Sequence, residues 1–145
     1  MSTENKAKIT LTSTIDNLLD IGLPSGERET SESTATGTVI SGTRGAIISF
    51  SEQSEGGEVK TKIEILASGI RVCRHGAIES DIYFSEGVAH RSVYSIPPYS
   101  FDANVFTRKI RGSIKSGDKL EIFYDMEIGG AKKSVKMSLV CDVEE

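Results

Sequence analysis

Tryptophan is absent from this sequence of 145 residues, and phenylalanine and tyrosine together account for only 6% of it. Any hydrophobic core must therefore be built mostly from aliphatic side chains. No run of about 18 consecutive apolar residues occurs, which excludes a membrane-spanning helix. The first residues, MSTENKAKIT, also lack the apolar segment of a signal peptide, so we expect a cytoplasmic protein with no membrane partner.

Cysteine is scarce as well, since Cys73 and Cys141 are the only two. Two cysteines do not make a disulfide framework for a chain of this length, and neither has neighbours at the spacing of a metal site. Both lie in apolar segments, which predicts buried free thiols. We therefore expect no structural disulfide, no metal and no cofactor.

The net charge of −4 is unevenly distributed along the chain. Residues 1–66 hold 6 basic and 10 acidic side chains, residues 67–117 hold 7 and 4, and residues 118–145 hold 4 and 7. The basic residues of the middle segment include Arg108, Lys109, Arg111 and Lys115. Nucleic-acid-binding proteins usually show a stronger and more continuous basic surface, so we do not expect a nucleic-acid partner. A solvated basic edge is the favoured interpretation.

Alternation of apolar and polar residues with a period of two dominates the chain. It is clearest in KITLTSTI (8–15), KLEIFYDMEI (119–128) and SVKMSLVCDV (134–143). Such alternation is typical of half-buried β-strands, and turns rich in glycine separate the segments at spacings typical of a sandwich or barrel. No long segment has an amphipathic helical pattern, although STIDNLLDIG (13–22) allows a short helical turn.

Glycine pairs predict two hairpin registers, because directly opposed residues share one face of a sheet. Two-residue loops at Gly129–Gly130 and at Gly56–Gly57 place the apolar residues of the flanking strands together on one face. The opposed pairs are Tyr124 with Val135, Ile122 with Met137 and Phe50 with Ile63.

The polar stretch RHGAIESDIYFSEGVAHRSVYS (74–95) contains both histidines of the chain and requires two further turns. A loop at Glu86–Gly87 opposes Ile82 to Arg91, and a turn at His75–Gly76 opposes Arg71 to Ser80. The predicted inner face holds Arg71, Ile78, Ser80, Ile82, Phe84, Arg91 and Val93. The predicted outer face holds Glu79, Tyr83, His90 and Tyr94.

Consecutive hairpins that share one apolar face form a meander, and a long meander usually closes to remove its exposed edges. We therefore predict an all-β protein, an antiparallel up-and-down β-barrel of about eight to ten strands. Residues 1–7 are expected to form a flexible N-terminus and residues 8–143 a single barrel domain. Pro97–Pro98 must break or turn the chain, and no register is predicted for residues 97–117.

The order of these segments resembles the YwiB-like family of bacterial proteins of unknown function. The similarity rests on RHGAIES (74–80), YFSEGVAHRSVYSIPPYSFD (83–102), VFTRKI (105–110) and KLEIFYDMEIGG (119–130). It implies a calycin-like (lipocalin-like) β-barrel, and it implies no known catalytic residue, substrate or cofactor. The recurring positions of the family match here at Arg74, Gly76, His90, Tyr94 and Pro97, and their role in the family is not established.

The sequence contains no motif of a serine hydrolase, a nucleotide-binding enzyme or a zinc protease, so we expect a non-catalytic protein. His75 and His90 are the residues that could serve in acid–base chemistry or metal binding. A metal would need a third ligand such as Glu79 or Asp81. The favoured interpretation of these side chains is the polar surface of a hairpin.

Two non-catalytic hypotheses remain. In the first, the barrel binds a small apolar or anionic ligand, with Arg71, Ser80, Arg91 and Tyr124 on its inner face. The opposing interpretation is that both arginines reach water from strand ends. In the second hypothesis side chains fill the barrel, and the protein is a protein-interaction or regulatory module with the basic edge 108–115 as its surface.

Overall fold

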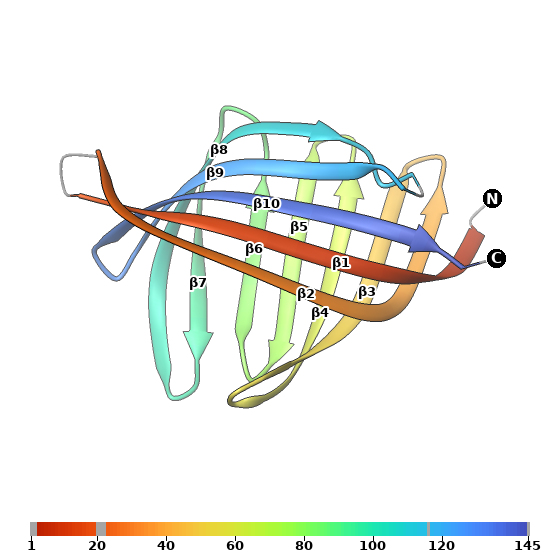
Figure 1. Ribbon diagram of the computed structural model, residues 1–145, viewed down its shortest axis with the longest axis horizontal. Helices are drawn as coiled ribbons and strands as arrows, with labels where there is room; N and C mark the ends of the chain where they lie inside the picture. The colour runs from red at the N-terminus through yellow and green to blue at the C-terminus, as the bar shows by residue number, and fades with distance from the viewer. Residues whose placement is uncertain (1–2, 20–22, 116, 145) are drawn as a thin grey trace.

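The computed structural model describes residues 3–19, 23–115 and 117–144, which form ten β-strands and no helix. Consecutive strands pair antiparallel and β1 also pairs with β10, so the sheet closes into an up-and-down barrel (Figure 1). The predicted all-β, calycin-like barrel of about eight to ten strands is confirmed. The strands are β1 (Thr3–Leu18), β2 (Pro24–Gly42), β3 (Gly45–Ser54), β4 (Gly57–Leu66), β5 (Gly69–Gly76), β6 (Glu79–Phe84), β7 (Ala89–Ile96), β8 (Tyr99–Gly112), β9 (Lys119–Ile128) and β10 (Ala131–Val143).

The strands form two groups that cross around the core. In Figure 1, β1, β2, β9 and β10 run across the front, β3 to β7 run steeply behind them, and β8 bends from the second group into the first. Alternate side chains of both groups point inward, as the period-two pattern predicts. The largest fully buried side chains include one aromatic ring and are otherwise aliphatic or small: Phe84, Ile9, Ile48, Val105, Thr107 and Cys141.

Two hairpins keep their predicted faces. At Gly129–Gly130 the register is as predicted, with Tyr124 opposite Val135. The β3–β4 hairpin turns one residue earlier than predicted, so Phe50 lies opposite Thr61. This changes the pairing by two residues along the partner strand, and because side-chain direction repeats every two residues, each side chain keeps its face.

A tight turn at Ala67–Ser68 separates β4 from β5, and the sequence analysis did not predict a turn at this position. Gly69 follows the turn with a φ of 152°, and a Cβ at this position would lie 2.2 Å from the carbonyl oxygen of Phe84. Only glycine fits so close to the neighbouring backbone. This residue therefore permits β5 to begin beside the end of β6.

The extra turn changes the face on which Arg71 lies. Arg71 is opposite Tyr83, and Arg74 is the residue opposite Ser80. Since Ser80 is buried and faces the interior, Arg74 is directed inward and Arg71 outward. The predicted inward placement of Arg71 is wrong because the Ala67–Ser68 hairpin was not recognised.

The β6–β7 connection is longer than predicted, because residues 85–88 all lie between the strands. The register moves by one residue, so that Ser80 lies opposite Tyr94 rather than Val93. A one-residue change exchanges the two faces of a strand. The predicted faces of β7 are therefore wrong: His90 and Tyr94 are directed inward, whereas Arg91 and Val93 are directed outward.

Strands also form in the segments that were predicted to be flexible, to allow a helical turn or to have no assignable register. β1 begins at Thr3, ahead of the expected domain start at Lys8, and Ala7 is fully buried. Residues 13–18 belong to β1 and not to a helical turn, while residues 20–22 lie outside the described part of the chain. In β8 the pairing with β9 shifts at Arg108, which interrupts the alternation in the segment for which no register was predicted.

Pairing is incomplete at two places in the barrel wall. β2 pairs with β3 only through residues 38–42, although β2 begins at Pro24. β6 and β7 pair only where Glu79 and Ser80 meet residues 94–95. The first half of β2 therefore separates from the far end of β3, and a mouth opens between them. No helix long and apolar enough to cross a membrane occurs among the residues described.

Candidate functional site

A row of polar side chains crosses the inner face of β4 to β7. Thr61 lies opposite Arg74, Arg74 lies opposite Ser80, and Ser80 lies opposite Tyr94. Directly opposed residues on antiparallel strands have Cβ atoms about 5 Å apart. Four adjacent strands thus place one guanidinium group among three hydroxyl groups.

Arg74 differs from the other arginines of the strands in having no acidic partner. Within the described chain its guanidinium forms no hydrogen bond and no ion pair, and its side chain is half-buried. The five other strand arginines each pair with a carboxylate: Arg28 with Asp16, Arg71 with Asp81, Arg91 with Asp102, Arg108 with Asp125, and Arg111 with Glu121. A partly covered charge without a partner is costly, so an anion that bound beside Arg74 would be stabilised.

Arg74 lines a cavity of about 350 Å³ at the mouth of the barrel. Volumes near and above about 300 Å³ are typical of small-molecule sites. The cavity lies where β1 and β2 face the ends of β3, β4 and β5. Its lining is mixed, with the apolar residues Leu11, Ile15, Val59 and Ile78 beside the polar residues Ser13, Ser31, Glu32, Ser33, Glu52, Gln53 and Ser54. Glu32 lies between the inward-facing Ser31 and Ser33 of β2, so its exposed side chain belongs to the outer face.

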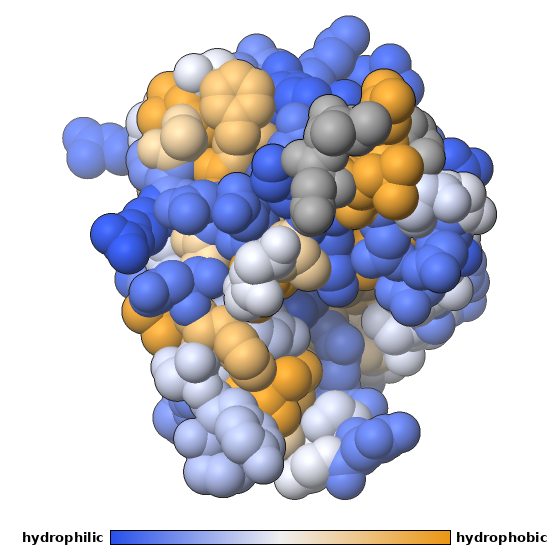
Figure 2. All heavy atoms as spheres, turned by 90° about the vertical axis from the view of Figure 1, so that its left-hand side faces the viewer, coloured by the Kyte–Doolittle hydropathy of each residue, from blue (hydrophilic) through white to orange (hydrophobic). Residues whose placement is uncertain are grey.

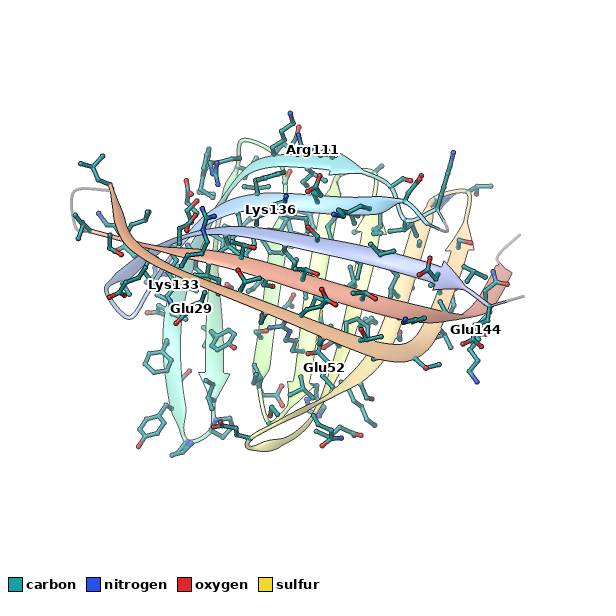
Figure 3. All side chains as sticks on the ribbon, viewed as in Figure 1. Glu29, Glu52, Arg111, Lys133, Lys136 and Glu144 are labelled. Atoms are coloured by element: carbon teal, nitrogen blue, oxygen red, sulfur yellow. The ribbon has the colours of Figure 1, made fainter. Side chains whose placement is uncertain are left out.

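Glu52 is a second charged residue of this cavity, and the sequence-based prediction did not include it. It follows Ile48 and Phe50 on the inward-facing positions of β3, and in Figure 3 it lies near the lower edge of β2. Its Oε1 atom is buried and has no hydrogen-bond partner among the described residues. A charged residue in an apolar alternating pattern was the signal that could have identified it.

Tyr124 lies deeper in the barrel, where its ring packs against Phe84 with 4.7 Å between ring centroids. Burial raises the pKa of Tyr124 to about 12, Arg74 acts against this rise, and Tyr94 adds to it. The three side chains therefore share one interior environment. The predicted inward placement of Ser80 and Tyr124 agrees with their burial.

Several buried polar atoms of the interior also have no partner among the residues described. They are Thr61 Oγ1, Thr107 Oγ1, Ser92 Oγ and His90 Nε2. The His90 ring instead meets the edge of Tyr83, with centroids 4.9 Å apart, where β6 and β7 are not paired. Buried polar groups normally find a partner, so the lumen has unused hydrogen-bonding capacity.

Arg71 and Arg91, the two cations proposed from the sequence, lie on the outer face. Arg71 donates from Nε to Asp81 at 2.8 Å, and this hydrogen bond lowers the pKa of the Asp81 carboxyl. Arg91 lies 3.6 Å from Asp102, and its side chain is 75% exposed. Cys73, half-buried beside Asp81, has a pKa raised first by burial. These residues contribute nothing to the lumen.

The remaining positions taken from the family resemblance shape turns. Gly76 has a φ of 122°, and a Cβ there would lie 2.3 Å from the carbonyl oxygen of Glu58. Its N–H donates to Glu79, and this bond, together with His75, lowers the pKa of Glu79. Pro97 forms a cis peptide bond with Pro98 in the β7–β8 turn.

The described side chains do not assemble a metal site or a catalytic pair of histidines. In the described part of the chain, no three His, Cys, Asp or Glu side chains are grouped so that they could hold a metal ion. His75 pairs with Glu79 at the surface, whereas His90 faces the interior.

The basic edge at Arg108 and Arg111 is largely neutralised. Arg108 pairs with Asp125, and both Arg111 and Lys136 pair with Glu121. The Glu121 carboxyl has a pKa lowered by Lys136 and Arg111. This surface is consistent with the solvated charged edge favoured from the sequence.

Comparison with known proteins agrees with the fold and the family resemblance. The chain superposes on the crystal structure of ywiB protein from Bacillus subtilis with a TM-score of 0.80 and 20% sequence identity. The alignment covers 98% of this chain and 94% of that one. No significant match to a curated protein is found. A family model described as a domain of unknown function, DUF1934, matches residues 19–139, and the chain therefore belongs to this family.

Proposed function

We propose that this protein is a non-catalytic binding protein whose barrel mouth takes a small molecule with an anionic group. The observation that carries the proposal is Arg74, a half-buried guanidinium that lines a cavity of about 350 Å³ and has no partner in the described chain. An arginine makes paired, charge-assisted hydrogen bonds with a carboxylate or a phosphate. The bound anion would supply the partner that the protein itself does not.

The rest of the cavity suits the body of such a ligand. Leu11, Ile15 and Val59 offer apolar contacts, and serine side chains of β1 and β2 offer hydrogen bonds. Small-molecule sites commonly combine an apolar lining with a few placed polar groups. The ligand class proposed here is a small amphipathic anion.

A second candidate function is a protein-interaction module, and the β7–β8 turn favours it. Residues 99–102 extend beyond the pairing of β8 with β9, which begins at Ala103. The turn exposes Ile96 by 45%, Tyr99 by 67% and Phe101 by 40%. Figure 2, viewed from the left-hand side of Figure 1, shows hydrophobic patches among hydrophilic side chains on this part of the barrel. We rank this function second because these side chains are not joined to an unpartnered buried charge.

Binding of octanoate, an amphipathic carboxylate, tests the first proposal. Isothermal titration calorimetry should show saturable binding to the wild type and a loss of at least about tenfold in affinity for Arg74→Gln, because the charge-assisted pair is removed. Arg91→Gln is the matched control, since Arg91 is exposed on the outer face. Equal binding by Arg74→Gln and wild type would overturn the proposal, and so would a wild type that binds neither octanoate nor 2-aminooctanoate.

A further inference from the structure

We infer that the ligand of the mouth cavity is a zwitterion, with its anionic group at Arg74 and a cationic amino group at Glu52. This inference rests on the proposed function and specifies the ligand class of the same site. A free amino acid with an apolar side chain is the simplest molecule with this chemistry. The inference is carried by Arg74 and Glu52, the two charged residues at inward-facing strand positions that line one cavity.

The pairing of the strands keeps the two charged residues one row apart. Glu52 lies opposite Val59, and Val59 lies opposite Gly76, two residues along β5 from Arg74. Two strand spacings and an offset of two residues separate the Cα atoms of Glu52 and Arg74 by about 12 Å, a span that their side chains and a bound small molecule can bridge. Gly76 has no side chain, so nothing at that position stands between Glu52 and the space beside Arg74.

Glu52 and Arg74 do not neutralise each other. Neither side chain forms an ion pair within the described chain, and Glu52 Oε1 is buried without a hydrogen-bond partner. A carboxylate withdrawn from water requires a donor or a positive charge. The site therefore presents an acceptor without a donor as well as a cation without an anion.

A simple anion would satisfy only one half of this site. Its negative charge would be attracted by Arg74 and repelled by Glu52, and Glu52 Oε1 would still lack a donor. A simple cation would be attracted by Glu52 and repelled by Arg74, and Arg74 would still lack an anion. A ligand with an ammonium and a carboxylate on neighbouring atoms satisfies both groups, while its apolar part contacts Leu11, Ile15 and Val59.

Three probes with the same eight-carbon chain separate these requirements: 2-aminooctanoate, octanoate and octylamine. Calorimetry on the wild type near neutral pH should show 2-aminooctanoate binding at least about tenfold more tightly than either of the others. Glu52→Gln should reduce its advantage over octanoate to within about twofold, because the carboxylate that pairs with the ammonium is gone. Arg74→Gln should reduce its advantage over octylamine in the same way.

Two control variants isolate the role of the Glu52 charge. Glu58→Gln changes an exposed residue of β4 and should leave the order of the three affinities unchanged. Glu52→Asp keeps the charge and should keep the preference for 2-aminooctanoate. Thermal unfolding of each variant shows that the barrel remains folded during the measurement.

The possible outcomes distinguish this inference from the proposed function. If octanoate binds the wild type as tightly as 2-aminooctanoate and Arg74→Gln weakens both, the zwitterion is excluded and the anion site stands. If Glu52→Gln alters the three affinities by the same factor, Glu52 has a structural or water-binding role and the inference fails. If none of the probes binds the wild type, both the inference and the proposed function fail.

Discussion

Arg71 and Arg74 belong to the same strand, β5, yet they occupy opposite environments. Arg71 lies on the outer face, where it holds Asp81 in a bidentate pair. Arg74 lies three residues later on the inner face, half-buried and without a partner in the described chain. The outer pair satisfies itself, whereas the inner arginine leaves its charge available to a ligand. In this barrel, whether a charged residue lies on the inner or the outer face decides whether its charge is available to a ligand.

The largest expected effect concerns the hairpin that separates these two faces. Gly69→Ala places a Cβ about 2.2 Å from a backbone oxygen at a positive φ, so the turn must distort. We expect the free energy of unfolding in urea to fall by at least about 3 kcal/mol. Gly26→Ala is the control, because Gly26 also has a positive φ but has open space around its Cβ position. An equal loss in the two variants would contradict this explanation.

The buried interior, unlike the outer face, should make the stability of the fold depend on alkaline pH. The pKa of Tyr124 is raised to about 12 by burial, whereas an unfolded tyrosine ionises near pH 10. The unfolded chain therefore releases this proton first, and stability should fall between about pH 10 and 12 by up to about 3 kcal/mol. Tyr124→Phe should remove this part of the decline in urea unfolding experiments. A decline of the same size in both proteins would show that Tyr124 is not responsible.

Replacing each arginine by methionine in the absence of ligand should change stability in opposite directions. Arg74→Met removes a half-buried charge without a partner and keeps an unbranched side chain, so we expect a gain of about 1 kcal/mol. Arg71→Met leaves Asp81 without its partner and should cause a small loss, since surface pairs contribute little. Chemical denaturation of the three proteins measures both changes. A clear loss for Arg74→Met would mean that its charge is already satisfied in the free protein.

The smallest expected effect is the acid response of the outer pair. Arg71 lowers the pKa of Asp81 in the folded protein, so the pair stabilises the fold above the unfolded pKa of about 4. The contribution is lost as the pH falls through the lower folded value. The difference in unfolding free energy between wild type and Asp81→Asn should therefore shrink from about pH 5 to pH 2. A difference that does not depend on pH would assign the effect to packing instead.

Most of the fold could be predicted from the sequence, because alternation and turn residues are local signals. The Gly129–Gly130 hairpin shows this best, since its predicted pairs are those observed. The candidate site was less predictable, because a single unrecognised turn or a longer loop reverses a face. That is what happened at Ala67–Ser68 and at residues 85–88, and it replaced Arg71 and Arg91 by Arg74 and Tyr94 on the inner face.

The sequence by itself determined that this protein is a single antiparallel barrel with a mainly aliphatic core. The period of two, the spacing of the turns and the scarcity of aromatic residues were sufficient for that. Only the tertiary structure decided which charged residues enter the lumen. Whether a side chain points inward depends on how its strand pairs with the neighbouring strands. The mouth exists because β2 pairs with β3 only through residues 38–42. The proximity of Arg74 and Glu52 is a product of that pairing, and no local pattern in the sequence records it.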